Sequence, residues 1–265
     1  MTVDAPESDL GPVDLLVSGA DLVVTMDDDR RELAGGWVAC RDGFVVGVGS
    51  SADALPPAAR VLRADGCLVT PGLVNTHHHI YQNLTRAYGP ATSASLFDWL
   101  TTLYPRWALL DEEGSYLSAW VGLAELAVGG CTTSTDHLYV HPAGGGDLLG
   151  AEIAAARELG LRFHPTRGSM SLSQKDGGLP PDSVVQDDDT ILAASEEAVA
   201  RWHDPAPGAM VRVALAPCSP FSVTADLMRR TAELAERLDV RLHTHLAEDI
   251  DEDRLCLELF GCRPI

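Results

Sequence analysis

A run of three histidines, His77 to His79, is the first candidate metal-binding motif in the sequence, and it follows the apolar segment 68–76. If that segment is a strand, alternate side chains share a face, so His77 and His79 point the same way and His78 points away. Two imidazoles on one face at the carboxyl end of a strand can bind one cation at the mouth of a barrel. A solvated histidine cluster that binds nothing is the alternative that this run alone leaves open.

A second motif with chemical potential is the sequence RLHTHLAE at residues 241–248. His245 ends the predicted strand, whereas His243 shares its face about 7 Å deeper and is predicted to pack or hydrogen-bond below the site. Glu248 falls where the strand gives way to a loop, and a carboxylate there could take a proton from water and deliver it to a leaving group. The alternative is a surface glutamate at the start of the acidic run 248–253.

Together the two motifs predict a metal site more strongly than either does alone, because both lie at the ends of predicted strands. Three neutral imidazoles suit Zn²⁺ or Fe²⁺ better than Mg²⁺ or Ca²⁺, which prefer oxygen ligands. The sequence therefore predicts a divalent metal held by His77, His79 and His245, with zinc favoured and Fe²⁺ as the alternative.

Apolar runs and helix signals place these motifs on repeated strand-loop-helix units. The second and third predicted strands begin about thirty residues apart, and so do the fourth and fifth. This spacing is the length of one βα unit. This repetition favours a (β/α)8 barrel or a doubly wound sheet, and the dinucleotide-binding form of the latter is weakened because no G-x-G-x-x-G follows a strand. The predicted strands are residues 68–76, 131–137, 161–166, 211–217 and 241–245.

Helices with recognisable start signals are predicted between these strands. Asp, Ser and Thr side chains accept hydrogen bonds from the free N–H groups of a first helical turn, and glycine ends a helix at little steric cost. The third unit is longer because of residues 171–189, a stretch rich in Gly, Pro and Asp that is predicted to be a functional loop. The predicted caps are Asp111, Asp147 and Ser222 or Thr224, with helix ends at Gly129, Gly160 and about Leu238.

The first part of the chain has the pattern of β-structure. Apolar runs rich in Leu and Val are separated by Asp42-Gly43, a strong hairpin signal because glycine tolerates a positive φ angle. We predict a small β-sandwich-like domain over residues 1–67, followed by the barrel over residues 68–265.

Composition and charge restrict the class of protein and of partner. The chain has 265 residues, of which 46% are apolar and 22% charged, so it can bury a large core. Its 19 basic and 39 acidic side chains give a formal net charge of −20, which argues against nucleic acid and anionic membranes and is compatible with a small neutral or cationic substrate. The sequence has no apolar run of roughly 18 residues and no signal-peptide pattern in its acidic start, which predicts a cytoplasmic protein.

The motif at 71–79 after a small β domain, taken with the motif at 243–248, resembles those of the amidohydrolase superfamily, and more narrowly its cytosine, guanine and S-adenosylhomocysteine deaminase branch. The resemblance covers nearly the whole chain. It implies a TIM-like (β/α)8 barrel, one divalent metal on the three predicted histidine ligands, and Glu248 as proton shuttle. The segments most similar to 8-oxoguanine deaminases are residues 75–88, 96–107, 130–139, 162–183 and 213–223.

The same resemblance implies hydrolytic deamination of an amino-purine, most specifically of 8-oxoguanine to urate and ammonia. Other branches of the superfamily hold two metals bridged by a carboxylated lysine, but the single lysine of this chain, Lys175, lies in the predicted loop, which favours one metal. Guanine, a pterin or an aminotriazine as substrate remains an alternative, as does a hydroxytriazine or chlorotriazine hydrolase, because all these molecules present a flat azine ring.

Three side chains are predicted to contact the substrate. Gln82 lies where similar guanine-type deaminases place a glutamine, and its amide offers both a donor and an acceptor to a lactam, with loop capping as the alternative. Arg167, at the end of the third strand, could donate to a purine carbonyl or form a structural ion pair. Cys218, after the fourth strand, could touch the five-membered ring or be a packed thiol. Asp136 and His137, at the end of the second strand, are predicted to be structural.

A group of aromatic residues follows the first metal motif. Their spacing is that of one face of a helix, which predicts core packing. A lid that stacks on a flat purine is the alternative. The group consists of Phe97, Trp99, Tyr104 and Trp107.

The resemblance implies eight βα units, of which five are accounted for before Ile265. The family's strand-six histidine and strand-eight aspartate have no counterpart in the sequence, and neither do the C-terminal strands that complete the small β domain. An incomplete barrel exposes an edge strand and apolar helix faces. We therefore expect a truncated chain with the first five units, unstable or poorly active alone, with a non-catalytic product of a truncated gene as the alternative. Because such barrels often associate, a homo-oligomer is compatible with the sequence.

Overall fold

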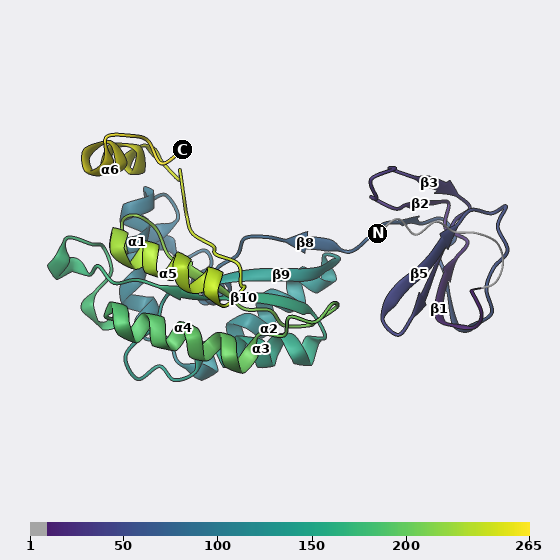
Figure 1. Cartoon of the computed structure of the whole chain (residues 1–265), viewed down its shortest axis with the longest axis horizontal. Coiled ribbons are helices and arrows are strands. Elements are labelled where there is room, and N and C mark those ends of the chain that lie inside the picture. The colour runs from purple at the N-terminus through teal and green to yellow at the C-terminus, as the bar shows by residue number, and fades with distance from the viewer. Residues whose placement is uncertain (1–9) are drawn as a thin grey trace. The chain divides into compact units, whose positions relative to one another are not determined.

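The computed structural model describes residues 10–265, and the chain divides into two compact units, one ending at Gly72 and the other running from Leu73 to Ile265 (Figure 1). The predicted boundary after residue 67 lies before this division. The reason is that β7 (Leu68–Val69) pairs in parallel with β2 (Leu22–Val24) of the first unit, so the predicted strand 68–76 is split between the two units.

The first unit contains two small β-sheets. Asp42 and Gly43 form the turn of the antiparallel hairpin between β4 (Trp37–Arg41) and β5 (Phe44–Gly49), as predicted, and both adopt positive φ angles, of 51° and 80°. Leu16 and Trp37 pack in the core of the larger sheet. In spatial order that sheet contains β5 (Phe44–Gly49), β4 (Trp37–Arg41), β1 (Val13–Ser18) and β6 (Ala58–Arg63), and the smaller sheet contains β3 (Glu32–Ala34), β2 and β7.

The second unit is built on a four-stranded parallel sheet. Its spatial order follows the chain without a reversal, which is the order of part of a barrel and not that of a doubly wound sheet. The strands are β8 (Leu73–Asn75), β9 (Cys131–Leu138), β10 (Arg162–Ser169) and β11 (Ala214–Pro217). The second to fourth predicted strands are therefore confirmed, with no end shifted by more than three residues, and β8 is the part of the first that belongs to this sheet.

The predicted fifth strand, residues 241–245, lies beside β11 but is not a regular strand. His243 N–H donates to the Leu215 carbonyl at 2.8 Å, and His245 N–H donates to the Cys218 carbonyl at 2.9 Å. One isolated bridge joins the two segments. The segment thus extends the parallel sheet by a short fifth element that carries the second histidine motif.

The predicted helix starts are confirmed. The side chains of Asp111, Asp147 and Thr224 accept hydrogen bonds from the first turns of α2, α3 and α5, so the third cap is Thr224 and not Ser222. Gly160 ends α3 in the left-handed conformation with φ 71°. The helices are α1 (Leu96–Trp107), α2 (Glu112–Val128), α3 (Leu148–Leu159), α4 (Asp188–Trp202), α5 (Ala225–Arg237) and α6 (Ile250–Phe260), and the 3-10 helices are η1 (Ile80–Thr85), η2 (Gly89–Ala91), η3 (Gln174–Asp176) and η4 (Asp182–Val184).

Helices α2, α3 and α4 cover one face of the parallel sheet (Figure 1). The main core of the second unit includes Leu123 of α2, Ile153 of α3 and Phe163 of β10, all fully buried. Between residues 10 and 265, none of the helices has both the length and the apolar character that crossing a membrane requires. The packed helix layer holds the strands in place, and the histidine motifs follow the carboxyl ends of those strands.

A glycine in β10 permits the close approach of β9. A Cβ atom at Gly168 would lie 2.2 Å from the Leu138 carbonyl oxygen and 2.7 Å from the Tyr139 Cα atom, both parts of the backbone. We therefore expect Gly168→Ala to lower the free energy of unfolding by about 1–3 kcal/mol, the range of an overpacked core. Urea denaturation measures this change.

The matched control is Gly89→Ala, because a Cβ atom at Gly89 meets nothing within 4 Å. Its effect on the unfolding free energy should stay within about 0.5 kcal/mol. Equal stability of the two variants would contradict the close approach at Gly168.

Candidate functional site

Three histidines from the two edges of the parallel sheet converge on one point. The ligand atoms of His77, His79 and His245 all lie within 4.8 Å of one another, and His79 Nε2 is 3.0 Å from His245 Nε2. In a flat sheet, four steps between neighbouring strands would separate the edges by roughly 19 Å. The sheet is therefore curled as in a barrel, and the curl brings the two motifs together.

The hydrogen bonds of two of these imidazoles assign their tautomers. His79 donates its Nδ1–H to the His137 carbonyl at 2.8 Å, and His245 donates its Nδ1–H to the Cys218 carbonyl at 2.7 Å. A carbonyl only accepts, so each ring carries its proton on Nδ1 and directs the Nε2 lone pair toward the other. Such outward hydrogen bonds are typical of metal-ligating histidines.

The charge state of the same pair fits a bound cation. Burial, and to a smaller extent the neighbouring imidazoles, lower the pKa of His79 to about 3 and that of His245 to about 4. Both rings are therefore neutral at pH 7, and no proton lies between the two facing lone pairs. A divalent metal ion would satisfy both nitrogens, with His77 as the third ligand.

A second set of potential ligands shares His245 but has poorer geometry. The ligand atoms of His137, Cys218 and His245 also lie within 4.8 Å of one another. However, the rings of His137 and His245 stack at 4.4 Å and 8°, so their in-plane lone pairs run side by side. Burial raises the pKa of the Cys218 thiol to about 12, which keeps it protonated. The set of His77, His79 and His245 is the better metal site.

Glu248 lies in the same pocket as the three converging histidines. Its loop is held by Glu252, whose carboxylate accepts the N–H groups of Ala247 at 2.9 Å and of Glu248 at 2.7 Å. Burial raises the pKa of Glu248, and the negative charges of Asp249 and Glu252 add to that rise. The pocket therefore combines a potential metal site with a carboxyl group that can hold a proton.

Aromatic side chains form much of the wall of this pocket, whose volume is about 200 Å³. Tyr104 and Trp107 of α1 are buried in the core, as predicted, and Tyr104 also reaches the pocket wall. Phe97 and Trp99 line the pocket. Helical spacing alone could not separate such pocket-lining aromatic residues from those that pack in the core. The remaining wall residues include Leu179 and Pro180 of the predicted functional loop, Tyr139, Ser219, Phe221 and Ser222.

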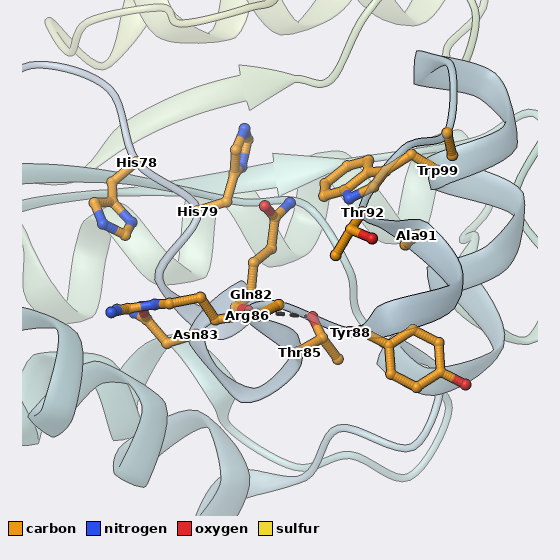
Figure 2. A pocket seen from close by; sticks show the side chains of 12 residues that line it. His78, His79, Gln82, Asn83, Thr85, Arg86, Tyr88, Ala91, Thr92 and Trp99 are labelled. Carbon is orange, nitrogen blue, oxygen red and sulfur yellow. Dashed lines mark hydrogen bonds between the residues drawn. The ribbon is translucent and has the colours of Figure 1, made fainter.

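Gln82 of η1 lies at the border of two cavities. It lines the histidine pocket and also an open cavity of about 690 Å³. Figure 2 shows its amide group beside His79, on the side toward Trp99. The open cavity is further lined by residues that include Arg86 and Tyr88. Gln82 is thus part of the wall of the histidine pocket, and a ligand bound in that pocket could contact its amide group.

The other two predicted substrate contacts have different positions. Cys218 is buried and lines the histidine pocket. Arg167 lines a separate cavity of about 500 Å³ and donates to the Gln186 side chain at 2.6 Å. Alternation along β10 explains this placement, because Arg167 shares a face with Phe163, which packs in the core beneath the helices. Arg167 is therefore not among the residues that line the histidine pocket.

The loop that carries the first motif is held by the end of β9. His137 N–H donates to the His78 carbonyl at 2.8 Å, and Ile80 N–H donates to a carboxylate oxygen of Asp136. Asp136 and His137, which the sequence predicts to be structural, therefore position the backbone on either side of His79. Their place at the carboxyl end of a strand was the only signal for this role in the sequence.

The family model of the amidohydrolase family matches residues 68–264. An 8-oxoguanine deaminase of Pseudomonas aeruginosa is 51% identical over 233 residues, which cover 88% of this chain and 52% of that protein. A hydroxydechloroatrazine ethylaminohydrolase of Pseudomonas sp. (strain ADP) is 39% identical, over 88% of this chain and 51% of that protein. The chain spans about half the length of the curated relatives it matches.

Solved structures show similarity over both units of the chain. A triazine hydrolase from Arthrobacter aurescens matches with a TM-score of 0.89 at 30% identity, over 94% of this chain and 56% of that one. An atrazine chlorohydrolase from Arthrobacter aurescens TC1, complexed with zinc, has a TM-score of 0.86 at 30% identity and the same coverage. An adenosine deaminase from Xanthomonas campestris with bound zinc has a TM-score of 0.81 at 25% identity, over 96% of this chain and 54% of that one.

Proposed function

Because this chain belongs to the amidohydrolase family, we propose that the protein is a metal-dependent hydrolytic deaminase of an amino-purine, with 8-oxoguanine as its substrate. The observation that carries the proposal is the convergence of three imidazoles beside a carboxyl group in one aromatic pocket. The similarity to an 8-oxoguanine deaminase supports the choice of purine.

His77, His79 and His245 would hold the metal, and we propose zinc because two neighbouring structures carry it. The ion would supply Lewis-acid activation of the attacking water. The only lysine, Lys175, lies on η3 and is not among the residues that line the pocket, which supports one metal and not a lysine-bridged pair.

Glu248 would move the protons of the reaction. Water adds to the amino-bearing ring carbon, Glu248 takes the proton that water loses, and it delivers that proton to the ring nitrogen. When the carbon–nitrogen bond to the amino group breaks, the proton of the added hydroxyl passes to the leaving group, a carbonyl forms and ammonia departs. The balance is 8-oxoguanine plus water giving urate plus ammonia.

The remaining pocket residues would bind and orient the ring. The Gln82 amide can donate to a carbonyl and accept from a ring N–H of a lactam. Phe97 and Phe221, which contact each other edge to face at 4.9 Å, offer flat apolar surface to a purine. The Cys218 thiol adds a small apolar contact at the pocket wall.

A second candidate function is hydrolysis of a substituted triazine. It is favoured by the similarity to a hydroxydechloroatrazine ethylaminohydrolase and to a triazine hydrolase. A triazine is also a flat azine, so the same pocket could hold it. The leaving group distinguishes the two functions, because an N-alkyl triazine releases an alkylamine and 8-oxoguanine releases ammonia.

The test is product release by the zinc-loaded protein from equimolar 8-oxoguanine, guanine, isoxanthopterin and a hydroxylated N-alkyl triazine. We expect ammonia from 8-oxoguanine, with kcat/KM at least about tenfold above that for each other substrate. Preferred release of an alkylamine would favour the second function. Failure to release ammonia from 8-oxoguanine would contradict the proposal for this chain.

Gln82→Ala should raise KM for 8-oxoguanine by about 10- to 100-fold, because the lactam loses a paired donor and acceptor. Its zinc content should equal that of the wild type, since Gln82 is not a ligand. The matched control is Gln186→Ala, which removes a glutamine from the separate cavity around Arg167. Steady-state kinetics in which the two variants raise KM equally would contradict a substrate contact at Gln82.

A further inference from the structure

Two carboxyl groups are buried against each other behind the candidate site. Asp136 of β9 and Glu152 of α3 are both fully buried, with 0% of each side chain exposed. The two side chains lie within interaction distance, and each shifts the pKa of the other. Neither residue lines the histidine pocket, so the reaction proposed above has no use for them.

The hydrogen bonding of this pair requires a shared proton. One oxygen of Asp136 accepts the Ile80 N–H, but its other oxygen and both oxygens of Glu152 have no donor among residues 10–265. Among residues 10–265, neither carboxyl group forms an ion pair with a Lys, Arg or His side chain. Two buried carboxylates in contact cannot both be ionised without a cation. One proton on the pair removes the repulsion and supplies the missing donor.

The surroundings assign that proton to Glu152. Burial raises the pKa of Asp136 to about 7, and the hydrogen bond from the Ile80 N–H partly offsets that rise by favouring the carboxylate. Glu152 has no such donors, and burial together with the charge of Asp136 raises its pKa well above the ordinary value. A proton on Glu152 would let its O–H donate to the free oxygen of Asp136.

The pair lies one hydrogen bond away from the loop of the first metal motif. Asp136 accepts the N–H of Ile80, the residue that directly follows His79. On the other side of His79, the His78 carbonyl accepts the N–H of His137, the residue that follows Asp136. Both ends of the short stretch around His79 are thus attached to β9.

We propose that Glu152 is a positioning residue of the metal site: it donates a hydrogen bond that orients Asp136, which holds the Ile80 N–H and thereby fixes the backbone that presents the His79 imidazole. The inference depends on the proposed function only in taking His79 as a ligand. It connects helix α3, on the outer layer of the fold, to the geometry of the metal site.

Two substitutions of Glu152 separate its hydrogen-bond donor from its bulk. Glu152→Gln keeps an N–H donor for Asp136, whereas Glu152→Leu keeps comparable bulk and removes the donor. We expect zinc affinity of the glutamine variant within about threefold of the wild type, and that of the leucine variant about 10- to 100-fold weaker, as for other losses of outer hydrogen bonds to ligands. Competition with a chromophoric zinc chelator measures both.

The control for a general loss of stability is Ile153→Ala, which removes a fully buried side chain from the next position of α3. It should lower the melting temperature while leaving zinc affinity of the folded protein unchanged. Equal losses of zinc affinity in the glutamine and leucine variants would overturn the proposal. So would an unchanged affinity in the leucine variant, or a comparable loss in Ile153→Ala.

Amide hydrogen exchange at Ile80, measured by NMR, provides a readout that does not need metal. The Ile80 amide should exchange at least about tenfold faster in Glu152→Leu than in Glu152→Gln, since it loses an oriented acceptor. If the wild type binds no zinc, the proposed function is wrong. The exchange rate of the Ile80 amide in the two Glu152 variants still tests whether Glu152 positions Asp136. If the leucine variant fails to fold, infrared absorption of the wild type and of Glu152→Gln provides the test. A protonated-carboxyl band at pH 7 that disappears in Glu152→Gln supports the proposal. Absence of that band from the wild type overturns it.

Discussion

Replacing His77 and His79 together with alanine should abolish stoichiometric zinc binding. The change removes two of the three converging imidazoles and leaves His245 alone, which weakens affinity by roughly a thousandfold or more. The double variant should remain folded, because His77 is exposed and neither ring is part of the main core. Metal analysis after dialysis against zinc-containing buffer gives the stoichiometry directly.

The run itself supplies the matched control. His78 stands between the two proposed ligands but points away from them, and it lines the open cavity and not the histidine pocket (Figure 2). His78→Ala should therefore retain one zinc per chain. Stoichiometric zinc in the double variant would show that the ligand assignment is wrong, whatever the behaviour of the control.

Glu248→Gln should leave zinc binding unchanged and lower the rate of deamination by about 10²- to 10⁴-fold, the usual contribution of a general acid-base group. The amide has the shape of the carboxylate but cannot accept the proton that water loses. The readout is ammonia release from 8-oxoguanine by zinc-loaded protein. Glu258→Gln, on the exposed part of α6, is the matched control and should have wild-type activity.

The pH dependence of the same reaction tests the role of Glu248 independently. Burial and the neighbouring Asp249 and Glu252 raise its pKa, so it stays protonated to a higher pH than an exposed glutamate does. As the pH falls through this raised pKa, Glu248 loses its capacity to accept a proton, and kcat/KM of the wild type should fall on the acidic side. The glutamine variant should lack this acidic limb; an identical limb in both proteins would assign it to another group.

The helix starts and the second to fourth strands were predictable because their causes are local. Asp111, Asp147 and Thr224 each accept a hydrogen bond from the helix that they precede, so the signal and its effect lie within three residues. The grouping of the histidines was predictable because strand alternation and a barrel order are general rules. The shortness of β8 and the irregular conformation of residues 241–245 could not be predicted, because both depend on pairing between distant parts of the chain.

The site was predicted less completely than the fold. The face on which Arg167 lies follows from Phe163, four positions earlier on the same strand, and that alternation is visible in the sequence. The Nδ1 tautomers of His79 and His245 depend on carbonyls that the chain brings from His137 and Cys218, which no local pattern predicts. The same holds for the buried approach of Asp136 to Glu152, because the two residues lie on separate elements, β9 and α3, which only the tertiary fold brings together.

The curl of the sheet also has a consequence for the lifetime of the protein in a cell. His79 and His245 are 166 positions apart, so an ion held by both would act as a cross-link that encloses most of the second unit. A ligand that binds only the folded state stabilises it by about 2.7 kcal/mol at a hundredfold excess over its dissociation constant. Proteases that cut unfolded chains would then remove the metal-free protein faster than the loaded one, so the cellular abundance of the protein would follow the supply of the metal.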